Sequence, residues 1–575
     1  MPDIDLIVRN GLVVDGLGGE PFEADVAVVN GRIAAIGKVQ GRAREEIDAR
    51  GKIVTPGFVD IHTHYDGQVT WDERLRPSSL PGVTSVVMGN CGVGFAPCRP
   101  EQRELLLQLM EGVEDIPQVV LAEGVPWKWE SFPQYLDFVA GRRFDIDCAA
   151  YVPHAALRVF VMGQRAFDRE PATADDRARM AAILTESIAA GAMGFGTSRT
   201  VLHRSSSGDT TPTVAATEAE LTALATAVAQ SGRGIMQFVS DWDDLDRVLP
   251  ELRRIIDASN CPLTIATAQQ HHAPTLYRDM LDWTAQANAD GHPVKVQVLC
   301  RPFGLVLGHD LSLNPFYTTA TYRKLAHLPL DQRVRELRRP EVKAAILDEP
   351  TDPNPTNLLG LRVRKFEWQF PFGDPPNYEP LPETSVAAQA QRRGMRPDEL
   401  CYDLLLEKDG HNLIYQAGSN YAHGSLDTVR EMLTDPHTVP ALGDGGAHLG
   451  CVCDASYSTF MLAHWTRDRT RGARLPLSFA VKQLTADTAD LVGLRDRGRL
   501  GVGYRADLNV IDIDRLTLGA PEIIRDLPAG GRRMIQRTKG YVATVVNGTV
   551  TYREGEATGA LPGRLVRGQQ DAPRR

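Results

Sequence analysis

Two histidines separated by one residue, His62 and His64, follow the largely apolar run 57–61. Because side chains alternate along a β-strand, the two imidazoles face the same side where that run ends. Neutral imidazoles placed in this way can share one divalent metal ion. The alternative is a pair of polar loop histidines, but the run, the spacing and the flanking sequence all agree with a metal site. We therefore predict that His62 and His64 are metal ligands.

Cys91 follows the second such run, 84–88, and stands between Gly89 and Gly92 in the sequence Gly-Asn-Cys-Gly. Glycines let the backbone approach a ligand closely. A thiolate at this point would be a good zinc ligand, and it could bridge two metals. The alternative is a buried structural cysteine, which is common. We predict that Cys91 is a further metal ligand and that Cys98 is structural.

Asp444 lies at the end of the run 439–443 and is followed by two glycines. A carboxylate there can take a proton from an activated water and deliver it to a leaving amine. The alternative is a structural role in a turn, where an aspartate before a glycine is common. We predict a catalytic role for Asp444 and include it among the metal ligands, whereas His448 is more simply a structural residue.

These side chains need a scaffold that brings strand ends together. Near-continuous apolar runs alternate with helical patterns, which favours parallel βα units, and eight runs are strand candidates: 57–61, 84–88, 148–152, 193–197, 235–239, 263–267, 294–299 and 439–443. We predict an α/β fold, a TIM-type (β/α)8 barrel, whose active site lies at the carboxyl ends of its strands. The long interval between the last two runs requires an insertion around 301–436, in which the Pro-rich segment 371–382 reads as a lid or a partner-facing loop.

Both ends of the chain carry short β-rich runs punctuated by turn signals such as Asn30-Gly31 and Asn547-Gly548. Neither end has enough strands for a stable sheet alone. We expect the two ends to form one small β-sandwich. The predicted domains are residues 1–55 as its N-terminal part, 56–495 as the catalytic barrel, and 496–575 as its C-terminal part with a tail.

Composition excludes several classes of protein. The 575 residues include 63 Lys and Arg against 73 Asp and Glu, a formal net charge of −10, so a nucleic-acid partner is not expected. No apolar run is long enough to span a membrane, and no secretory signal is seen at the start. Eight scattered cysteines form no disulfide framework. We expect a cytoplasmic protein with a small-molecule substrate, and leave the oligomeric state open, a homo-oligomer included.

The order of the predicted domains, the His62-x-His64 pair and Asp444 resemble the amidohydrolase superfamily. The Gly-Asn-Cys-Gly run at 89–92, the segment 152–158, the Gly-Ala-Met-Gly run at 191–194 and the tail segments 498–507 and 558–564 resemble more narrowly its N-acyl-D-amino-acid deacylase (D-aminoacylase) family. This resemblance spans nearly the whole chain. It implies that Cys91 binds metal in place of the carboxylated lysine of many relatives. The sequence agrees, since no lysine occurs between Lys128 and Lys295.

The fifth and sixth runs depart from the family, which takes one histidine from each. Gln237 stands where the first is expected, and His271 and His272 fall a few residues beyond the second. A bulge could bring them to the site; otherwise they are loop residues. An amide oxygen is neutral and hence a poor donor. We predict one divalent ion in preference to two, most simply zinc, given nitrogen and sulfur ligands.

The predicted reaction is hydrolysis of a carbon–nitrogen amide bond by metal-activated water. The substrate would be an N-acyl (D-)amino acid or a similar small amide. Its binding residues are unknown; Arg158 and Arg199 are candidates for pairing its carboxylate, with structural salt bridges as the favoured role. A cyclic amide, carbamate or lactone is an alternative substrate. A catalytically silent barrel that acts as a binding or scaffold protein is a second alternative, although such a protein has no need of His62, His64 and Asp444.

Overall fold

A ring of parallel strands forms the centre of the molecule in the computed structural model, which describes residues 4–241, 243–353, 355 and 358–574. One parallel group is β6 (Phe58–Asp60), β7 (Val83–Met88) and β8 (Asp147–Ala150). The other is β9 (Val152–Pro153), β10 (Gly194–Ser198), β11 (Ile235–Val239), β12 (Leu263–Ala266), β13 (Val294–Val298) and β17 (Thr438–Pro440). The chain runs from β8 directly into β9. Each of the eight predicted strands overlaps one of these elements.

Hydrogen bonds close the ring between the last strand and the first. The amide of Asp444 donates to the carbonyl of His62 over 3.2 Å, and the amide of His64 donates to the carbonyl of Gly445 over 2.8 Å. The segments that follow β17 and β6 therefore run side by side. This closure brings three of the predicted site residues to the same edge of the ring.

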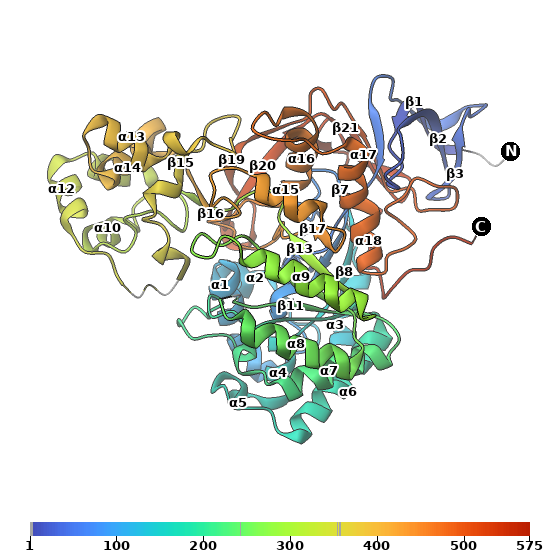
Figure 1. Ribbon diagram of the computed structural model, residues 1–575, viewed down its shortest axis with the longest axis horizontal. Helices are drawn as coiled ribbons and strands as arrows, with labels where there is room; N and C mark the ends of the chain where they lie inside the picture. The colour runs from blue at the N-terminus through green and yellow to red at the C-terminus, as the bar shows by residue number, and fades with distance from the viewer. Residues whose placement is uncertain (1–3, 242, 354, 356–357, 575) are drawn as a thin grey trace.

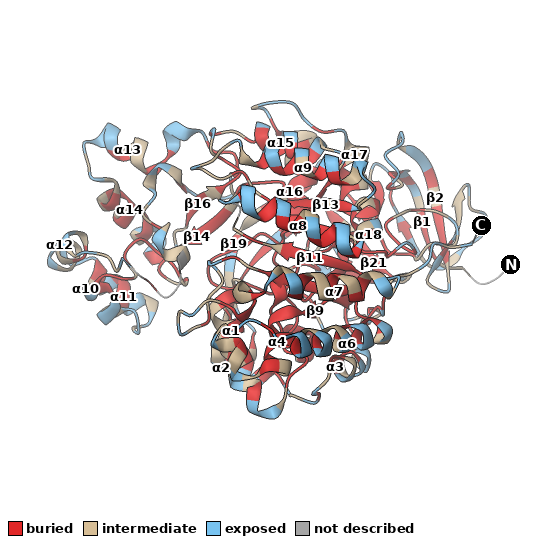
Figure 2. Cartoon of the chain, turned by 60° about the horizontal axis from the view of Figure 1, so that its bottom comes forward, coloured by how far each residue is buried: buried red, intermediate tan, exposed pale blue. Residues whose placement is uncertain are grey.

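Helices connect consecutive strands on the outside of the ring. Between β9 and β13 they are α4 (His154–Met162), α5 (Gln164–Phe167), α6 (Ala174–Ala190), α7 (Glu218–Gln230), α8 (Leu245–Ser259) and α9 (Leu276–Ala289) (Figure 1). Thr173 caps α6 by accepting from the amide of Asp176, and Thr217 caps α7 by accepting from that of Glu220. Their apolar faces turn inward, and the exposed residues lie on their outer faces (Figure 2).

The two ends of the chain pair in one nine-stranded sheet. Its N-terminal strands are β1 (Ile4–Val13), β2 (Phe22–Val29), β3 (Arg32–Gly37), β4 (Ala43–Asp48) and β5 (Ile53–Pro56). Its C-terminal strands are β18 (Leu508–Ile511), β21 (Tyr541–Val546), β22 (Thr549–Arg553) and β23 (Glu556–Ala557). β5 pairs with β18 and joins the two sets. Both termini consequently lie at the same end of the molecule (Figures 1 and 2).

The segment between β13 and β17 projects from the ring (Figure 1). It holds the antiparallel strands β14 (Phe303–Leu307), β15 (Gln369–Pro371) and β16 (Ile414–Ser419). Its projecting helices are α10 (Ala320–Leu325), α11 (Leu330–Leu337), α12 (Pro340–Asp348), α13 (Val386–Arg393) and α14 (Pro397–Leu406). A further helix of this segment, α15 (Asp427–Thr434), packs against β13 and β17. The Pro-rich stretch 371–382 does not form the expected lid, because its aromatic residues Phe372 and Tyr378 are buried in the main core. Sequence analysis also missed the hairpin β19 (Thr517–Arg525) and β20 (Arg532–Lys539).

Among the described residues, no helix combines the length and the apolar character that crossing a membrane would require.

Candidate metal centre

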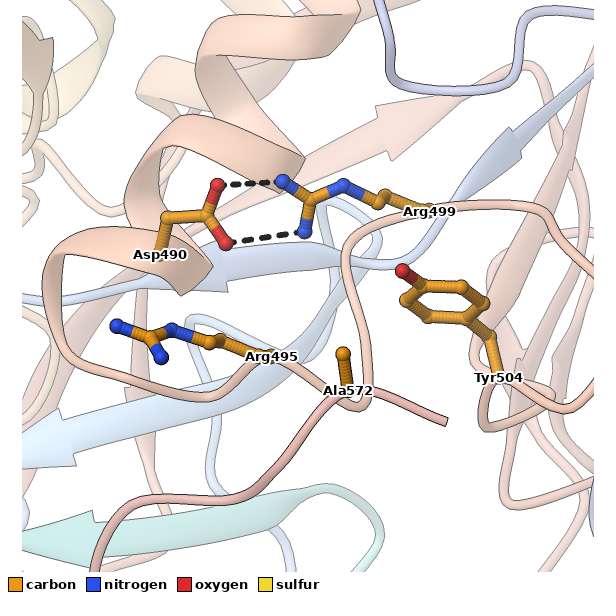
Figure 3. A pocket seen from close by; sticks show the side chains of 5 residues that line it. All are labelled: Asp490, Arg495, Arg499, Tyr504 and Ala572. Atoms are coloured by element: carbon orange, nitrogen blue, oxygen red, sulfur yellow. Dashed lines mark hydrogen bonds and ion pairs between the residues drawn. The ribbon is translucent and has the colours of Figure 1, made fainter. Parts of the chain in front are cut away.

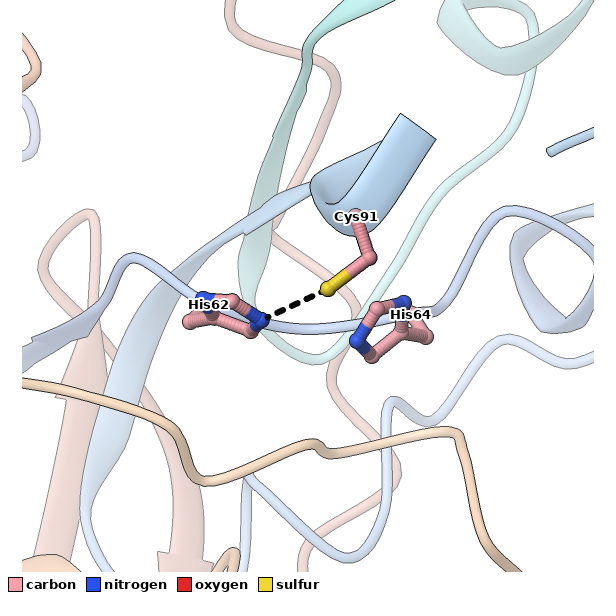
Figure 4. Close-up of side chains that lie close together, drawn as sticks. All are labelled: His62, His64 and Cys91. Atoms are coloured by element: carbon pink, nitrogen blue, oxygen red, sulfur yellow. Dashed lines mark hydrogen bonds between the residues drawn. The ribbon is translucent and has the colours of Figure 1, made fainter. Parts of the chain in front are cut away.

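Three of the predicted ligands, His62, His64 and Cys91, gather at the carboxyl ends of β6 and β7 (Figure 4). One donor atom of each lies within 4.8 Å of the donor atoms of the other two, and all three residues are buried. His62 Nε2 is 3.4 Å from the Sγ of Cys91. Two imidazole nitrogens and a thiol sulfur at such spacing fit the donor set of a zinc ion.

The turn after β7 places Cys91 by an unusual backbone conformation. Cys91 is left-handed, with φ of 56°, and Gly89 has φ of 84°. A Cβ on Gly89 would lie 2.4 Å from the carbonyl oxygen of Tyr151, so no larger residue fits there. The amide of Cys91 donates to Oε1 of Gln237 over 2.9 Å. Gln237, which replaces the histidine implied by the family resemblance, thus positions the cysteine.

Gln297 on β13 determines which nitrogen of His62 faces the site. Its Oε1 lies 2.7 Å from His62 Nδ1, and its amide nitrogen donates to Thr264 Oγ1 over 3.1 Å. An amide oxygen only accepts, so Nδ1 carries the proton and Nε2 presents its lone pair toward Cys91. Burial lowers the pKa of His62 to about 4, which keeps the ring neutral. The sequence offered a signal for Gln297, a glutamine that alternates with the valines of the predicted strand 294–299.

Asp444 joins the three residues from the turn after β17. Its Oδ1 lies 3.6 Å from Nε2 of both His62 and His64. Burial alone raises the pKa of Asp444, but the hydrogen bond with His64 and the nearby imidazoles outweigh it and lower that pKa to about 2. Its carboxylate therefore stays ionised and holds a negative charge beside the two imidazoles.

A carboxylate that sequence analysis did not single out, Glu114, stands behind His64. It is the last residue of α1 (Arg103–Glu114) and is 1% exposed. Its Oε1 lies 3.2 Å from Nδ1 of His64, and its Oε2 lies 3.8 Å from Nε2 of His448. Burial lowers the pKa of His64, but the charge of Glu114 and the hydrogen bond with Asp444 raise it well above the ordinary histidine value.

A cavity of about 270 Å³ opens above these side chains. Much of its wall is apolar, and these lining residues include Leu202, Val239, Ala266, Phe303, Leu305 and Val452. Of the described residues that line it, Arg362 is the one lysine or arginine, and no described carboxylate pairs with it. Arg158 and Arg199 do not line the cavity. They pair instead with Glu220 and Glu251, as structural salt bridges.

The two histidines that follow β12, His271 and His272, do not join the cluster. His271 bonds through Nε2 to the carbonyl of Ala417 over 2.9 Å and stacks near Trp368. His272 lines the cavity, where its Nε2 pairs with Asp243 over 2.8 Å. A further histidine, His203, also lines the cavity, and burial lowers its pKa to about 3. Across the part of the chain that the structure describes, a three-donor cluster forms at His62, His64 and Cys91 and nowhere else.

A second pocket, of about 450 Å³, lies near the C-terminus (Figure 3). It is lined by Asp490, Arg495, Arg499, Tyr504 and Ala572. Asp490 and Arg499 neutralise each other in a two-pronged ion pair. The residues that line this pocket include no histidine or cysteine, so the cavity above His62, His64 and Cys91 is the candidate site.

A parallel ring with buried donors at the carboxyl ends of its strands is the architecture of a barrel enzyme. The model of the amidohydrolase family matches residues 45–552, and the chain belongs to that family. The family resemblance seen in the sequence is therefore confirmed.

Relatives within the family extend over the whole chain. N-acyl-D-glutamate deacylase of Alcaligenes xylosoxydans xylosoxydans is 32% identical over 98% of this chain and 96% of its own length. D-aminoacylase of the same organism is 26% identical, covering 98% and 97%. The structure of an N-acyl-D-glutamate deacylase from Bordetella bronchiseptica, complexed with zinc and a phosphonate inhibitor, superposes with a TM-score of 0.65 at 23% identity, covering 98% of this chain and all of that one. That structural similarity shows that the two chains share a fold.

Proposed function

We propose that this protein is a metal-dependent amidohydrolase that removes the acyl group from an N-acyl amino acid, with the D-enantiomer as the expected substrate. The observation that carries the proposal is the buried cluster of His62, His64 and Cys91 with Asp444 beside it, in the wall of a cavity lined by both apolar and polar residues. The activities of the deacylase relatives support the substrate class.

The chemistry of the donors fits one divalent ion, and zinc best among them. His62, His64 and Cys91 would hold it, with Asp444 as a fourth donor or as a base beside it. A second ion would need its own donors. Gln237 is engaged with the backbone of Cys91, and His271 and His272 bond elsewhere.

A bound divalent ion would polarise the scissile carbonyl and make water more acidic. The carboxylate of Asp444 is placed to take a proton from an attacking water and would return it to the nitrogen of the departing amino acid. Gln297 keeps the lone pair of His62 directed at the site. The apolar wall excludes bulk water from the scissile bond.

The cavity also suggests how the substrate is oriented. An N-acyl amino acid carries one carboxylate, and Arg362 is the cation of the cavity wall among the residues that the structure describes. We propose that Arg362 pairs with this carboxylate, because a guanidinium can bind both its oxygens at once. The acyl chain would then lie against Leu202, Val239 and Phe303.

Release of free amino acid from a panel of N-acetyl-D- and N-acetyl-L-amino acids tests the proposal, with zinc-loaded protein. Hydantoins, carbamates and lactones belong in the same panel. We expect turnover of N-acyl amino acids, abolished in Asp444→Asn. Turnover confined to cyclic amides or lactones would replace the proposed substrate class, and no turnover of any compound by zinc-loaded protein would favour a binding role.

A further inference from the structure

We infer that Glu114 is a positioning residue of the metal site, which supports His64 from behind and contributes negative charge to the cluster. This inference rests on the proposed metal site but assigns a residue that the reaction scheme above does not use. Its basis is geometric. Glu114 ends α1, a helix outside the ring, yet its side chain is buried against the edge of His64 that faces away from Cys91.

The surroundings of Glu114 leave it few partners. Neither carboxylate oxygen makes a hydrogen bond of good geometry with any described residue, and no lysine or arginine pairs with it. The groups that meet it are the Nδ1 edge of His64 at 3.2 Å and the Nε2 edge of His448 at 3.8 Å. A buried carboxylate without a full partner is costly unless a cation compensates it. A divalent ion one imidazole away is such a cation.

The two histidines of the cluster are then supported in different ways. His62 rests on a neutral amide, Gln297, whereas His64 rests on a carboxylate. A carboxylate behind a metal-binding imidazole holds the Nδ1 proton, directs Nε2 at the metal and makes that nitrogen a stronger donor. Glu114 therefore raises the affinity of the site for its ion through His64.

Zinc affinity, measured by competition with a chromophoric chelator at fixed pH, tests this without any assay of activity. Glu114→Gln keeps a neutral acceptor at the same place, like that behind His62, and should weaken zinc binding about tenfold. Glu114→Ala removes the contact and should weaken it by up to roughly 100-fold, the range found for such supporting residues. Glu104→Gln, on the exposed side of the same helix, is the matched control and should leave the affinity unchanged.

A double-mutant cycle separates positioning from a general effect on the fold. In a His64→Gln background, Glu114→Ala should change the zinc Kd by less than twofold. An equal loss in both backgrounds, or no loss in the wild-type background, would overturn the inference. The visible spectrum of the cobalt-loaded protein gives a second readout, and Glu114→Ala should alter it whereas Glu104→Gln should not. A wild-type chain that binds no zinc would instead refute the proposed site itself.

Discussion

Each of the three clustered donors, His62, His64 and Cys91, is held in place by a second side chain that lies outside the cluster. Gln297 orients His62, Glu114 backs His64, and Gln237 holds the backbone of Cys91. Because the donors follow two different strands, β6 and β7, small rotations of any one side chain would separate them. These supporting contacts are what make three dispersed residues a preformed site.

Cys91→Ala should lower metal occupancy and activity together while the fold survives. The thiol supplies one of three clustered donors, so its loss should weaken zinc binding by at least ~100-fold, more than a supporting residue would. Elemental analysis after dialysis measures the occupancy, and circular dichroism checks the fold. Cys98→Ala is the control, since its sulfur bonds to the carbonyl of Arg99 outside the cluster. Unchanged occupancy in Cys91→Ala would make that cysteine structural.

The metal count is a second prediction at the scale of residues. Elemental analysis of wild-type protein should give about one equivalent of zinc per chain. His62→Ala should empty the site, whereas His271→Ala and His272→Ala should each leave the occupancy unchanged because their rings bond outside the cluster. Two equivalents of zinc, with one lost on mutation of His271 or His272, would show that a second ion binds at these histidines.

Residue types in the sequence predict part of this centre and not the rest. His62 and His64 follow an apolar run, and the period of a strand is enough to place them on one side. Cys91 also follows an apolar run, but its position depends on the left-handed turn after β7. Glu114 could not be found in this way. It ends an amphipathic helix that carries two other glutamates, Glu104 and Glu111, and only the packing of that helix against the ring shows which one is buried.

At the scale of elements, buried charges tie the projecting segment to the ring. Glu379 lies in the Pro-rich stretch and accepts from Arg469 and His464, which lie beyond β17. The amide of Leu426 also donates to it. Burial raises the pKa of Glu379, but these donors outweigh burial and lower it to about 2 from an ordinary value of 4.5.

The interactions of Glu379 with its donors should make the free energy of unfolding fall in acid. A carboxyl whose pKa is depressed by folding stabilises the fold fully above pH 4.5 and loses that contribution as the pH falls toward 2. Glu379→Gln should therefore be less stable than wild type at pH 6, on the order of 2 kcal/mol, and the difference should shrink by pH 3. Urea unfolding at both pH values measures it, with the exposed Glu383→Gln as the control. A difference that does not change with pH would contradict this role.

The sequence predicts the ring strands but not the hairpin of β19 and β20, and the difference has a physical reason. The eight ring strands are buried on both faces, so their apolar runs stand out. The hairpin of β19 and β20 has no such run, because charged residues such as Arg525, Arg533 and Arg537 interrupt it. Its order comes from contacts far away in sequence, including hydrogen bonds from Arg533 to the carbonyl of Arg76 and from the amide of Met534 to the carbonyl of Leu449.

At the scale of the whole molecule, the sheet made from the two ends must be held to the ring that carries the site. A buried guanidinium does so at the amino ends of the strands. Arg497, 2% exposed, donates to Asp147 at the start of β8 over 2.7 Å and to Ser85 on β7 over 2.8 Å. Asp507, just before β18, lies 4.0 Å from the same guanidinium. One side chain thus connects two ring strands to the terminal sheet.

Arg497→Met keeps much of the side-chain volume but removes the charge that Asp147 and Asp507 share. Breaking a buried ion pair by removing one partner typically costs about 3–5 kcal/mol, and Arg505, which also pairs with Asp147 over 2.8 Å, should hold the loss near the lower figure. We expect urea unfolding to show this loss in the free energy of unfolding. Zinc affinity should stay within about twofold of wild type, because the change lies at the opposite end of the strands from the cluster. The exposed Arg495→Met is the control. If Arg497→Met were as stable as wild type, Arg505 alone would suffice to join the sheet to the ring.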